Sequence, residues 1–290
     1  MRIRFSPYQL IGQEGFTNRE GALLEFTFED DTVGYADCHP WEELGDLSLE
    51  QQLSFLREGQ LTPMTTRSLD FALIDSQARS KKINLFENLE LPESHCLIGS
   101  DIFPEEFQIY KCKDPRLCLE LLPKLPEDKK IRMDFNFKLT KGQFIEFLGR
   151  ARPYFKSFDF IEDPFAFDPQ TWKEFETEYG IPFALDRAKE GEEHTLRVIK
   201  PAVDAPRQDE TSSRCLFTSY LDHPLGQAAA AYTAAVSGCR NVCGLASHLV
   251  YQPNAFSQRF QMNKARLVIP PLGYGFGFDD CLEELHWRHL

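Results

Sequence analysis

The chain has 290 residues, of which 42% are hydrophobic and 27% are charged, as in ordinary soluble globular proteins. Its formal net charge of −13 argues against surfaces that bind nucleic acid or anionic membranes. The sequence has no apolar run long enough for a transmembrane helix, and its first residues predict a strand, not a signal peptide. The eight cysteines form no CxxC pair. We therefore expect a cytoplasmic protein with reduced core cysteines, and its oligomeric state stays open.

The first part of the chain predicts a small α+β domain, residues 1–93. Apolar and polar residues alternate over 24–28, which is typical of one strand of an antiparallel hairpin. A capping-box pattern from Ser48 to Gln51 begins a helix, and a second helix is predicted over 66–79.

From residue 94 the pattern becomes strand, helix, strand, helix, which indicates an α/β fold with a parallel sheet. Eight such strands predict a closed barrel of the TIM type, residues 94–268, which is trimmed after its sixth strand because residues 204–213 are short and polar. The tail, 269–290, is glycine-rich and aromatic, and we expect it to pack back on the first domain. The predicted strands cover residues 96–98, 107–113, 131–136, 158–162, 182–186, 196–200, 214–220 and 241–246.

Five successive strands end in ionisable residues. In chain order these are Lys111 with Lys113, then Asp134, Glu162, Asp186 and Lys200. Barrel enzymes carry their chemistry at the C-terminal ends of the strands, where these residues fall. The spacing therefore predicts a single site.

Three carboxylates that converge in a partly buried barrel mouth would repel one another. A hard divalent cation removes this repulsion, and all-oxygen ligation favours Mg²⁺, with Mn²⁺ as the other option. Asp134, Glu162 and Asp186 are thus candidate metal ligands. The alternative is that each acid simply pairs with a nearby lysine or arginine.

Two lysines flank the acids in strand order. Lys113 lies two residues from Lys111 on one face of a strand, and a neighbouring cation, burial or a metal ion would lower its pKa, so that neutral lysine can act as a base. Lys200 enters from the far side of the acids. The alternative for these lysines is that they reach solvent or pair with acids. A base beside a divalent cation suits abstraction of a proton next to a carboxylate.

These residues carry a family resemblance. The motifs Lys-x-Lys at 111–113, Asp-x-Asn at 134–136, Ile-Glu-Asp-Pro at 161–164, Leu-Asp at 185–186 and Ile-Lys-Pro at 199–201 resemble the enolase superfamily, muconate-lactonizing subgroup. Within it, the string from Arg132 to Asn136, the 221–226 segment and the short chain are most similar to the o-succinylbenzoate synthase family.

The resemblance implies an N-terminal α+β capping domain on a modified (β/α)7β barrel. It implies Mg²⁺ bound by the three acids, Lys113 as base and Lys200 as a cation opposite it. Lys111, Arg132 and Asn136 would support the site, and Ser219 and Tyr220 are candidates to contact a small-molecule carboxylate substrate. The implied reaction dehydrates 2-succinyl-6-hydroxy-2,4-cyclohexadiene-1-carboxylate to o-succinylbenzoate in menaquinone biosynthesis.

Some features leave alternatives open. Arg187-Ala188 departs from the family pattern beside Asp186, and the loop 12–19 could either cover the barrel mouth or be solvated. The same five charged residues would also serve an N-acylamino acid racemase, a dipeptide epimerase or a muconate cycloisomerase. Residues 244–248 lack the Asp-x-Asp expected of an epimerase. A non-catalytic barrel that only binds a partner is the remaining alternative.

Overall fold

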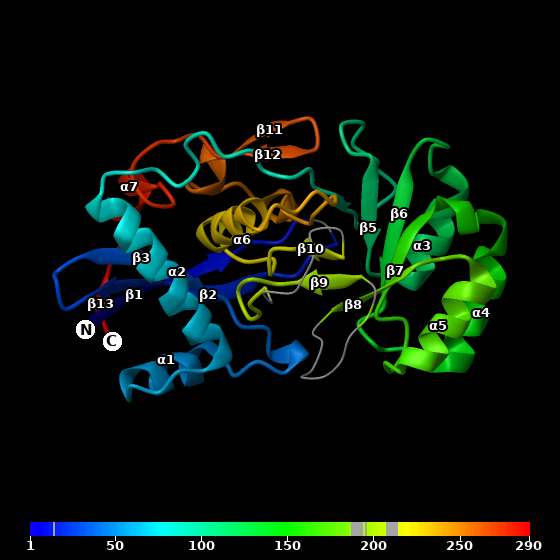
Figure 1. Cartoon of the computed structure of the whole chain (residues 1–290), viewed down its shortest axis with the longest axis horizontal. Coiled ribbons are helices and arrows are strands. Elements are labelled where there is room, and N and C mark those ends of the chain that lie inside the picture. The colour runs from blue at the N-terminus through cyan, green and yellow to red at the C-terminus, as the bar shows by residue number, and fades with distance from the viewer. Residues whose placement is uncertain (14, 187–193, 195, 207–213) are drawn as a thin grey trace.

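The computed structural model describes residues 1–13, 15–186, 194, 196–206 and 214–290. An antiparallel sheet with two helices forms one side of the molecule, and a parallel sheet with its own helices forms the other (Figure 1). The antiparallel sheet has the order β13-β1-β2-β3. Its strands are β1 (Arg2–Leu10), β2 (Arg19–Thr27), β3 (Val33–Cys38) and β13 (Arg288–His289).

Helices α1 (Leu49–Arg57) and α2 (Pro63–Ser80) cover this sheet, and α2 packs along β3. The side chain of Ser48 caps α1 in a capping box with Gln51, as predicted from the sequence. Helix α2 begins at Pro63 after a second capping box at Thr62, a few residues before the predicted start.

The parallel sheet contains seven strands in sequential order, from β4 to β10. Each strand pairs with the next one in the chain, which is the topology of a (β/α) barrel. The strands are β4 (Cys96–Leu97), β5 (Ile109–Cys112), β6 (Lys130–Asp134), β7 (Phe158–Glu162), β8 (Phe183–Asp186), β9 (Arg197–Ile199) and β10 (Cys215–Phe217).

Two residues close the barrel where the sequence predicts a full eighth strand. Cys243 forms a parallel bridge with Ser94, and Gly244 forms one with Thr218. The Gly244 N–H donates to the Phe217 carbonyl at 2.8 Å, and the His95 N–H donates to the Cys243 carbonyl at 2.7 Å. The eighth strand is therefore reduced to a two-residue link between β10 and the segment that enters β4.

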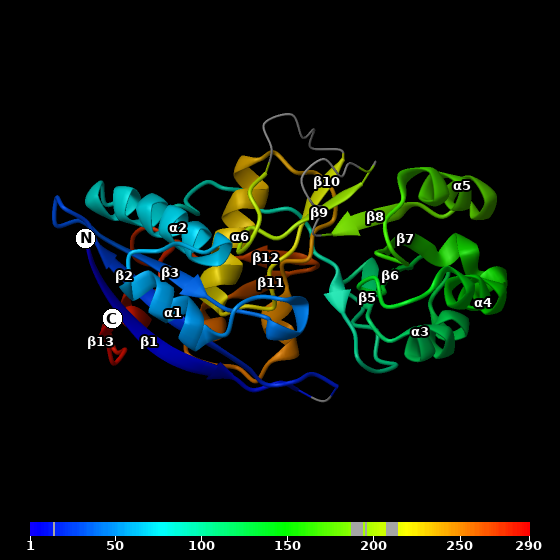
Figure 2. The ribbon, with the colours of Figure 1, turned by 90° about the horizontal axis from the view of Figure 1, so that it is seen from below.

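Helices α3, α4 and α5 lie side by side over the outer face of β5–β8 (Figures 1 and 2). Aromatic side chains of α4 and α5 pack there with outward-facing residues of the strands. Helix α6 instead contacts both β10 and β3, so it joins the two halves through one hydrophobic core. The bounds are α3 (Pro115–Leu121), α4 (Lys141–Ala151), α5 (Pro169–Tyr179) and α6 (Pro224–Val236), with 3₁₀ helices at Glu42–Leu44, Leu122–Lys124, Arg152–Ser157, Ser247–Val250 and Ser257–Arg259.

Side chains alternate along each strand between the outer face, which packs against the helices, and the inside of the barrel. On β6, Ile131 and Met133 point outward into the helix layer, whereas Arg132 and Asp134 lie on the opposite face. Because all seven strands run in the same direction, their C-terminal residues meet at one mouth.

The end of the chain contacts the N-terminal unit. The Phe276 N–H donates to Asp75 of α2 at 2.7 Å, and the Leu290 N–H donates to the Ile3 carbonyl at 3.1 Å. Both chain ends lie beside the antiparallel sheet in Figure 1. The remaining elements are β11 (Gln261–Asn263), β12 (Arg266–Val268) and α7 (Asp279–Glu283).

All eight cysteines are buried and free, which agrees with their expected role in the core. Cys112 belongs to the outer helix-facing cluster and points away from the lysines on either side of it. Among the described residues, no helix has the length and apolarity that a membrane crossing requires.

Candidate active site

A pocket with about 540 Å³ of empty space opens at the C-terminal ends of the barrel strands. Lys111, Lys113 and Lys200 line it from the barrel, and Trp41 and Leu44 line it from the N-terminal unit. Both halves of the protein therefore contribute to one cavity.

The three candidate metal ligands end three adjacent strands. Asp134 and Glu162 are register partners on β6 and β7, and Asp186 ends β8. Their exposed fractions are 1%, 0% and 3%, respectively. The sheet thus buries three carboxylates at one edge, where their charges require compensation.

Lys111 supplies much of that compensation. Its Nζ lies 2.7 Å from Glu162 Oε2 and 3.0 Å from Asp134 Oδ2. Burial alone would lower the pKa of Lys111, but the two carboxylates outweigh it and raise the pKa above its ordinary value. Lys111 is therefore a permanent cation at the centre of the acids.

Lys113 is in a different electrostatic position, although it lies only two residues away. Its Nζ is 3.5 Å from Asp134 Oδ2, and its side chain is 36% exposed. Burial lowers the pKa of Lys113, and the neighbouring charges of Lys111 and Lys200 lower it further, against the opposing effect of Asp134. Of the three lysines, Lys113 is the one whose pKa lies below its ordinary value.

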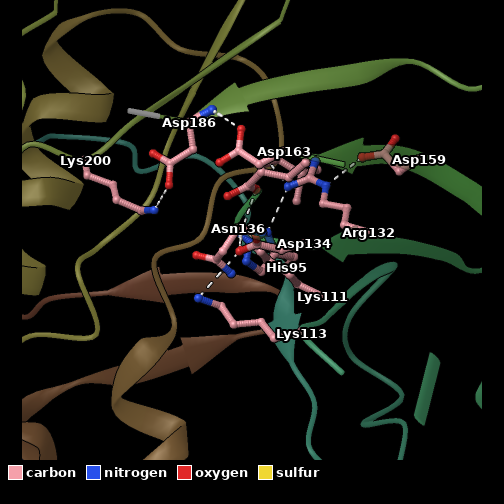
Figure 3. Close-up of polar contacts among 12 residues, drawn as sticks. His95, Lys111, Lys113, Arg132, Asp134, Asn136, Asp159, Asp163, Asp186 and Lys200 are labelled. Atoms are coloured by element: carbon pink, nitrogen blue, oxygen red, sulfur yellow. Dashed lines mark hydrogen bonds and ion pairs between the residues drawn. The ribbon is translucent and has the colours of Figure 1, made fainter. Parts of the chain in front are cut away.

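Lys200 approaches from β9 and forms an ion pair with Asp186 (Figure 3). Burial opposes its charge, but Asp186 and Glu162 raise the pKa of Lys200 above the ordinary value. Figure 3 shows Lys113 and Lys200 extending toward the acids from different strands. The two lysines are thus placed on two sides of the acids with opposite proton preferences.

The hydrogen-bond partners of the buried carboxylate oxygens indicate what else the acids could bind. Glu162 Oε1 is buried and accepts no hydrogen bond from any described residue, whereas Asp134 Oδ2 has the ammonium groups of Lys111 and Lys113 at 3.0 and 3.5 Å. Burial, and next the charge of Asp134, raises the pKa of Glu162 to about 7, whereas Lys111 leads the charges that pull the pKa of Asp134 well below its usual range. A buried carboxylate oxygen that has no hydrogen-bond partner is a suitable ligand for a hard divalent cation such as Mg²⁺.

The three acids do not lie close enough together to form a complete metal-binding site. Among the described residues, no set of three His, Cys, Asp or Glu side chains is gathered closely enough to hold a metal ion. The lysines occupy the space between the acids: Lys111 contacts two of them and Lys200 the third. Metal binding would therefore require these side chains to move relative to one another.

Asp163 is a site residue that sequence reasoning missed. Its carboxylate accepts the backbone N–H of Asp186 at 2.9 Å, so it fixes the end of β8. Asp163 is 2% exposed, has a φ of 48°, and burial beside three other acids raises its pKa well above the usual value. Asp163 belongs to the Ile-Glu-Asp-Pro motif at 161–164, which could have identified it, but the motif was interpreted through Glu162 alone.

Arg132 and Asn136 do not reach the pocket lining. Arg132 lies inside the barrel, where it pairs with Asp159 at 2.7 Å and its guanidinium stacks over the Phe160 ring at 4.5 Å. Asn136 has a φ of 48°, and its backbone N–H donates to Asp134 Oδ1 at 3.0 Å. Both residues therefore contact other site residues and are not among the residues that line the pocket.

Ser219 and Tyr220 both line the pocket. The Ser219 hydroxyl pairs with Ser247 at 2.6 Å, and the Tyr220 hydroxyl donates to Asp46 at 2.8 Å. The indole N–H of Trp41 donates to the Tyr220 carbonyl at 2.9 Å. The two bonds of Tyr220 tie the seventh strand end to the N-terminal unit, a connection that the sequence did not reveal.

The loop over 12–19 is docked on the barrel without lining the pocket. Gly12 bridges to Tyr251, and the Gln13 N–H donates to the Val250 carbonyl at 2.9 Å. Its Phe16 packs against a small cluster beside Leu97 and Leu221, which do line the pocket. Arg187-Ala188, the departure from the family pattern, lies outside the described residues.

Two sequence comparisons show which known proteins this chain resembles. Residues 3–78 match a family model described as the N-terminal domain of o-succinylbenzoate synthase. The chain is 29% identical to an o-succinylbenzoate synthase of Bdellovibrio bacteriovorus, over 100% of this chain and 99% of the relative. The chain is thus similar to the o-succinylbenzoate synthase family, in its first 78 residues and over its full length.

Solved structures of low identity show the same fold. A mandelate racemase/muconate lactonizing enzyme from Roseiflexus sp. has a TM-score of 0.78 at 13% identity, over 94% of this chain and 96% of that one. A dipeptide epimerase from Cytophaga hutchinsonii, complexed with Mg and a dipeptide, has a TM-score of 0.75 at 14% identity, over 100% and 99%. A muconate cycloisomerase variant gives 0.75 at 14%, over 99% of both chains. The enolase-superfamily fold is therefore established for this chain.

Proposed function

We propose that this protein is an o-succinylbenzoate synthase, a hydro-lyase that converts 2-succinyl-6-hydroxy-2,4-cyclohexadiene-1-carboxylate to o-succinylbenzoate for menaquinone synthesis. The observation that carries the proposal is the placement of Lys113 and Lys200 in one pocket on two sides of three buried acids. The full-length similarity to an o-succinylbenzoate synthase supports the same reaction.

Asp134, Glu162 and Asp186 would hold Mg²⁺, or Mn²⁺, at the strand ends. When bound, the cation would supply electrostatic stabilisation of the extra negative charge that develops on the substrate carboxylate. The buried Glu162 Oε1, which has no hydrogen-bond partner among the described residues, supports this assignment. A cation there, together with the lysines, also explains how a protein of net charge −13 could bind an anionic substrate.

Lys113 would remove the proton next to the substrate carboxylate. Its lowered pKa favours the neutral amine that a base requires. The same lysine, once protonated, would give its proton to the departing hydroxide, so that water leaves and the ring becomes aromatic. One residue then serves as base and acid in turn.

Lys200 would remain an ammonium ion throughout. Its raised pKa keeps it charged, and its position by Asp186 directs that charge into the pocket from the side opposite Lys113. Lys200 would therefore stabilise the negative charge on the substrate without transferring a proton. A racemase needs both lysines to exchange protons, so the opposite pKa shifts of Lys113 and Lys200 favour dehydration over racemisation.

The test is a comparison of initial rates on two substrates at one Mg²⁺ concentration. The cyclohexadiene carboxylate should be dehydrated efficiently, whereas an N-acylamino acid should racemise slowly or not at all. Racemisation without dehydration would overturn the proposal and favour the racemase alternative. Dipeptide and muconate substrates in the same assay test the epimerase and cycloisomerase alternatives, and no turnover of any of these would favour a binding protein.

A further inference from the structure

The pocket reaches deeper into the barrel than the catalytic lysines. His95 precedes β4 and is 6% exposed, yet it lines the pocket together with Gly244 of the closing link. A Cβ atom at position 244 would lie 2.7 Å from His95 Cε1 and 2.9 Å from its Nε2. The glycine therefore leaves open the corner of the pocket next to the imidazole edge.

The contacts of His95 fix its tautomer. Nδ1 lies 2.8 Å from Nη1 of Arg132, as Figure 3 shows. A guanidinium can only donate hydrogen bonds, so Nδ1 must accept and the ring proton must reside on Nε2. Arg132 also donates to the Val242 carbonyl at 2.9 Å and pairs with Asp159, which holds the guanidinium in place.

The ring is also kept neutral. Burial, and then the charges of Arg132, Lys111 and Lys113, lower the pKa of His95 well below its usual value, and only Asp134 opposes them. Its Nε2–H makes no hydrogen bond with any residue that the structure describes. His95 therefore presents one oriented, uncharged donor to the pocket that it lines.

We propose that His95 is a specificity-determining residue that donates an Nε2–H hydrogen bond to an oxygen of the substrate side chain, remote from the reacting carboxylate. Arg132 is its positioning residue. This inference rests on the proposed function, in which the reacting carboxylate occupies the lysine and acid end of the pocket. The acceptor is then a carbonyl or carboxylate oxygen of the succinyl group.

The test uses His95→Leu, which removes the donor, and His95→Gln, which restores an N–H. For His95→Leu, KM for the cyclohexadiene substrate should rise about tenfold while kcat changes little, because the bond is equally present in ground and transition states. His95→Gln should recover part of that loss. Calorimetric affinity in Mg²⁺ should fall similarly for o-succinylbenzoate but not for benzoate, which lacks the side chain.

Gly244→Ala provides a second variant that keeps the imidazole. Its methyl group would lie within 2.9 Å of His95 and 2.8 Å of Thr218, so it should displace the imidazole from its position and also raise KM for the succinyl compound. His223→Leu is the matched control, because His223 is a buried histidine with a lowered pKa that does not line the pocket. It should lower thermal stability and leave KM unchanged.

The outcomes separate the two proposals. If wild-type protein turns over the substrate and His95→Leu changes stability but not KM, His95 is only a core residue and this inference is wrong. If Gly244→Ala leaves KM unchanged, the corner is not used and the inference is again wrong. If wild-type protein neither binds o-succinylbenzoate nor dehydrates its precursor, the proposed function fails first and this assignment fails with it.

Discussion

Lys111 donates a hydrogen bond of 2.7 Å to Glu162 across the intervening strand β6, whose Asp134 lies 3.0 Å from the same ammonium group. One lysine thereby compensates two buried carboxylates while it lowers the pKa of Lys113 two residues away. The roles of structural cation and pKa modulator are combined in a single side chain. Substitutions at this position therefore test both the stability and the chemistry of the site.

Replacement of Lys111 by Met should shift the pH–rate profile upward. Removing its charge removes one of the effects that lower the pKa of Lys113, so the basic amine should appear only at higher pH. It also leaves Asp134 and Glu162 uncompensated, so thermal stability should fall. The measurement is kcat/KM against pH, with Lys124→Met, an exposed lysine paired with Asp101, as control. An unshifted profile would show that Lys111 does not tune the base.

Lys113→Ala and Lys200→Ala should each reduce kcat about a thousandfold or more and leave the protein folded. Lys113→Ala should cost little stability because its side chain is 36% exposed. Lys200→Ala should lower stability more, since it leaves the buried Asp186 without its ion pair. Steady-state kinetics with circular dichroism checks both. A folded variant with near wild-type turnover would remove that lysine from the mechanism.

Mg²⁺ should raise the melting temperature of the chelator-treated protein. Binding to the folded state alone stabilises it by mass action, and Glu162 Oε1 has no other partner among the described residues. Glu162→Gln should abolish the Mg²⁺ effect, whereas Asp128→Asn, an exposed acid away from the site, should retain it. Equal thermal shifts for wild type and Glu162→Gln would place the metal elsewhere, and full turnover after exhaustive chelation would contradict a metal requirement.

Asp222→Asn should stabilise the protein at alkaline but not at acidic pH. Both carboxylate oxygens of Asp222 are buried without a hydrogen-bond partner among the described residues, and Asp37 of β3 lies beside it, since a Cβ atom at Gly226 would be 2.6 Å from Asp37 Oδ2 and 2.8 Å from Asp222 Oδ2. Burial raises the pKa of Asp222 from 3.8 to about 7. Its contribution to stability is thus fully present below the unfolded pKa and is lost as pH rises through about 7.

The charged and titratable groups around this pair are Tyr8, His39 and His223, of which Tyr8 donates to Asp37 at 2.7 Å. Burial lowers the pKa of each histidine to about 3, so neither offers a charge that would offset Asp222. Thermal unfolding should be measured at about pH 4, near the ordinary pKa of an aspartate, and at about pH 8: the variant should gain roughly 2 °C or more at the higher pH and much less at the lower. An equal gain at both values would show that ionisation of Asp222 is not the cause.

The sequence by itself determined the strand ends and their charges. Period-two alternation forces residues such as Arg132 and Asp134 to one face of a strand, and alternating helices force the strands to run parallel. These local rules were enough to predict the α/β fold and the mouth where Lys113 and Lys200 would meet the acids. They also predicted that Cys112 points away from that mouth.

Tertiary structure decided what lies beside those residues, because long-range packing brings together segments that no local period connects. His95 belongs to no motif in the sequence, and only the link through Gly244 places it in the pocket. Trp41 reaches the pocket from the other half of the chain. The opposite pKa shifts of Lys113 and Lys200 likewise arise from burial and from charges on neighbouring strands, which exist only once the barrel has formed.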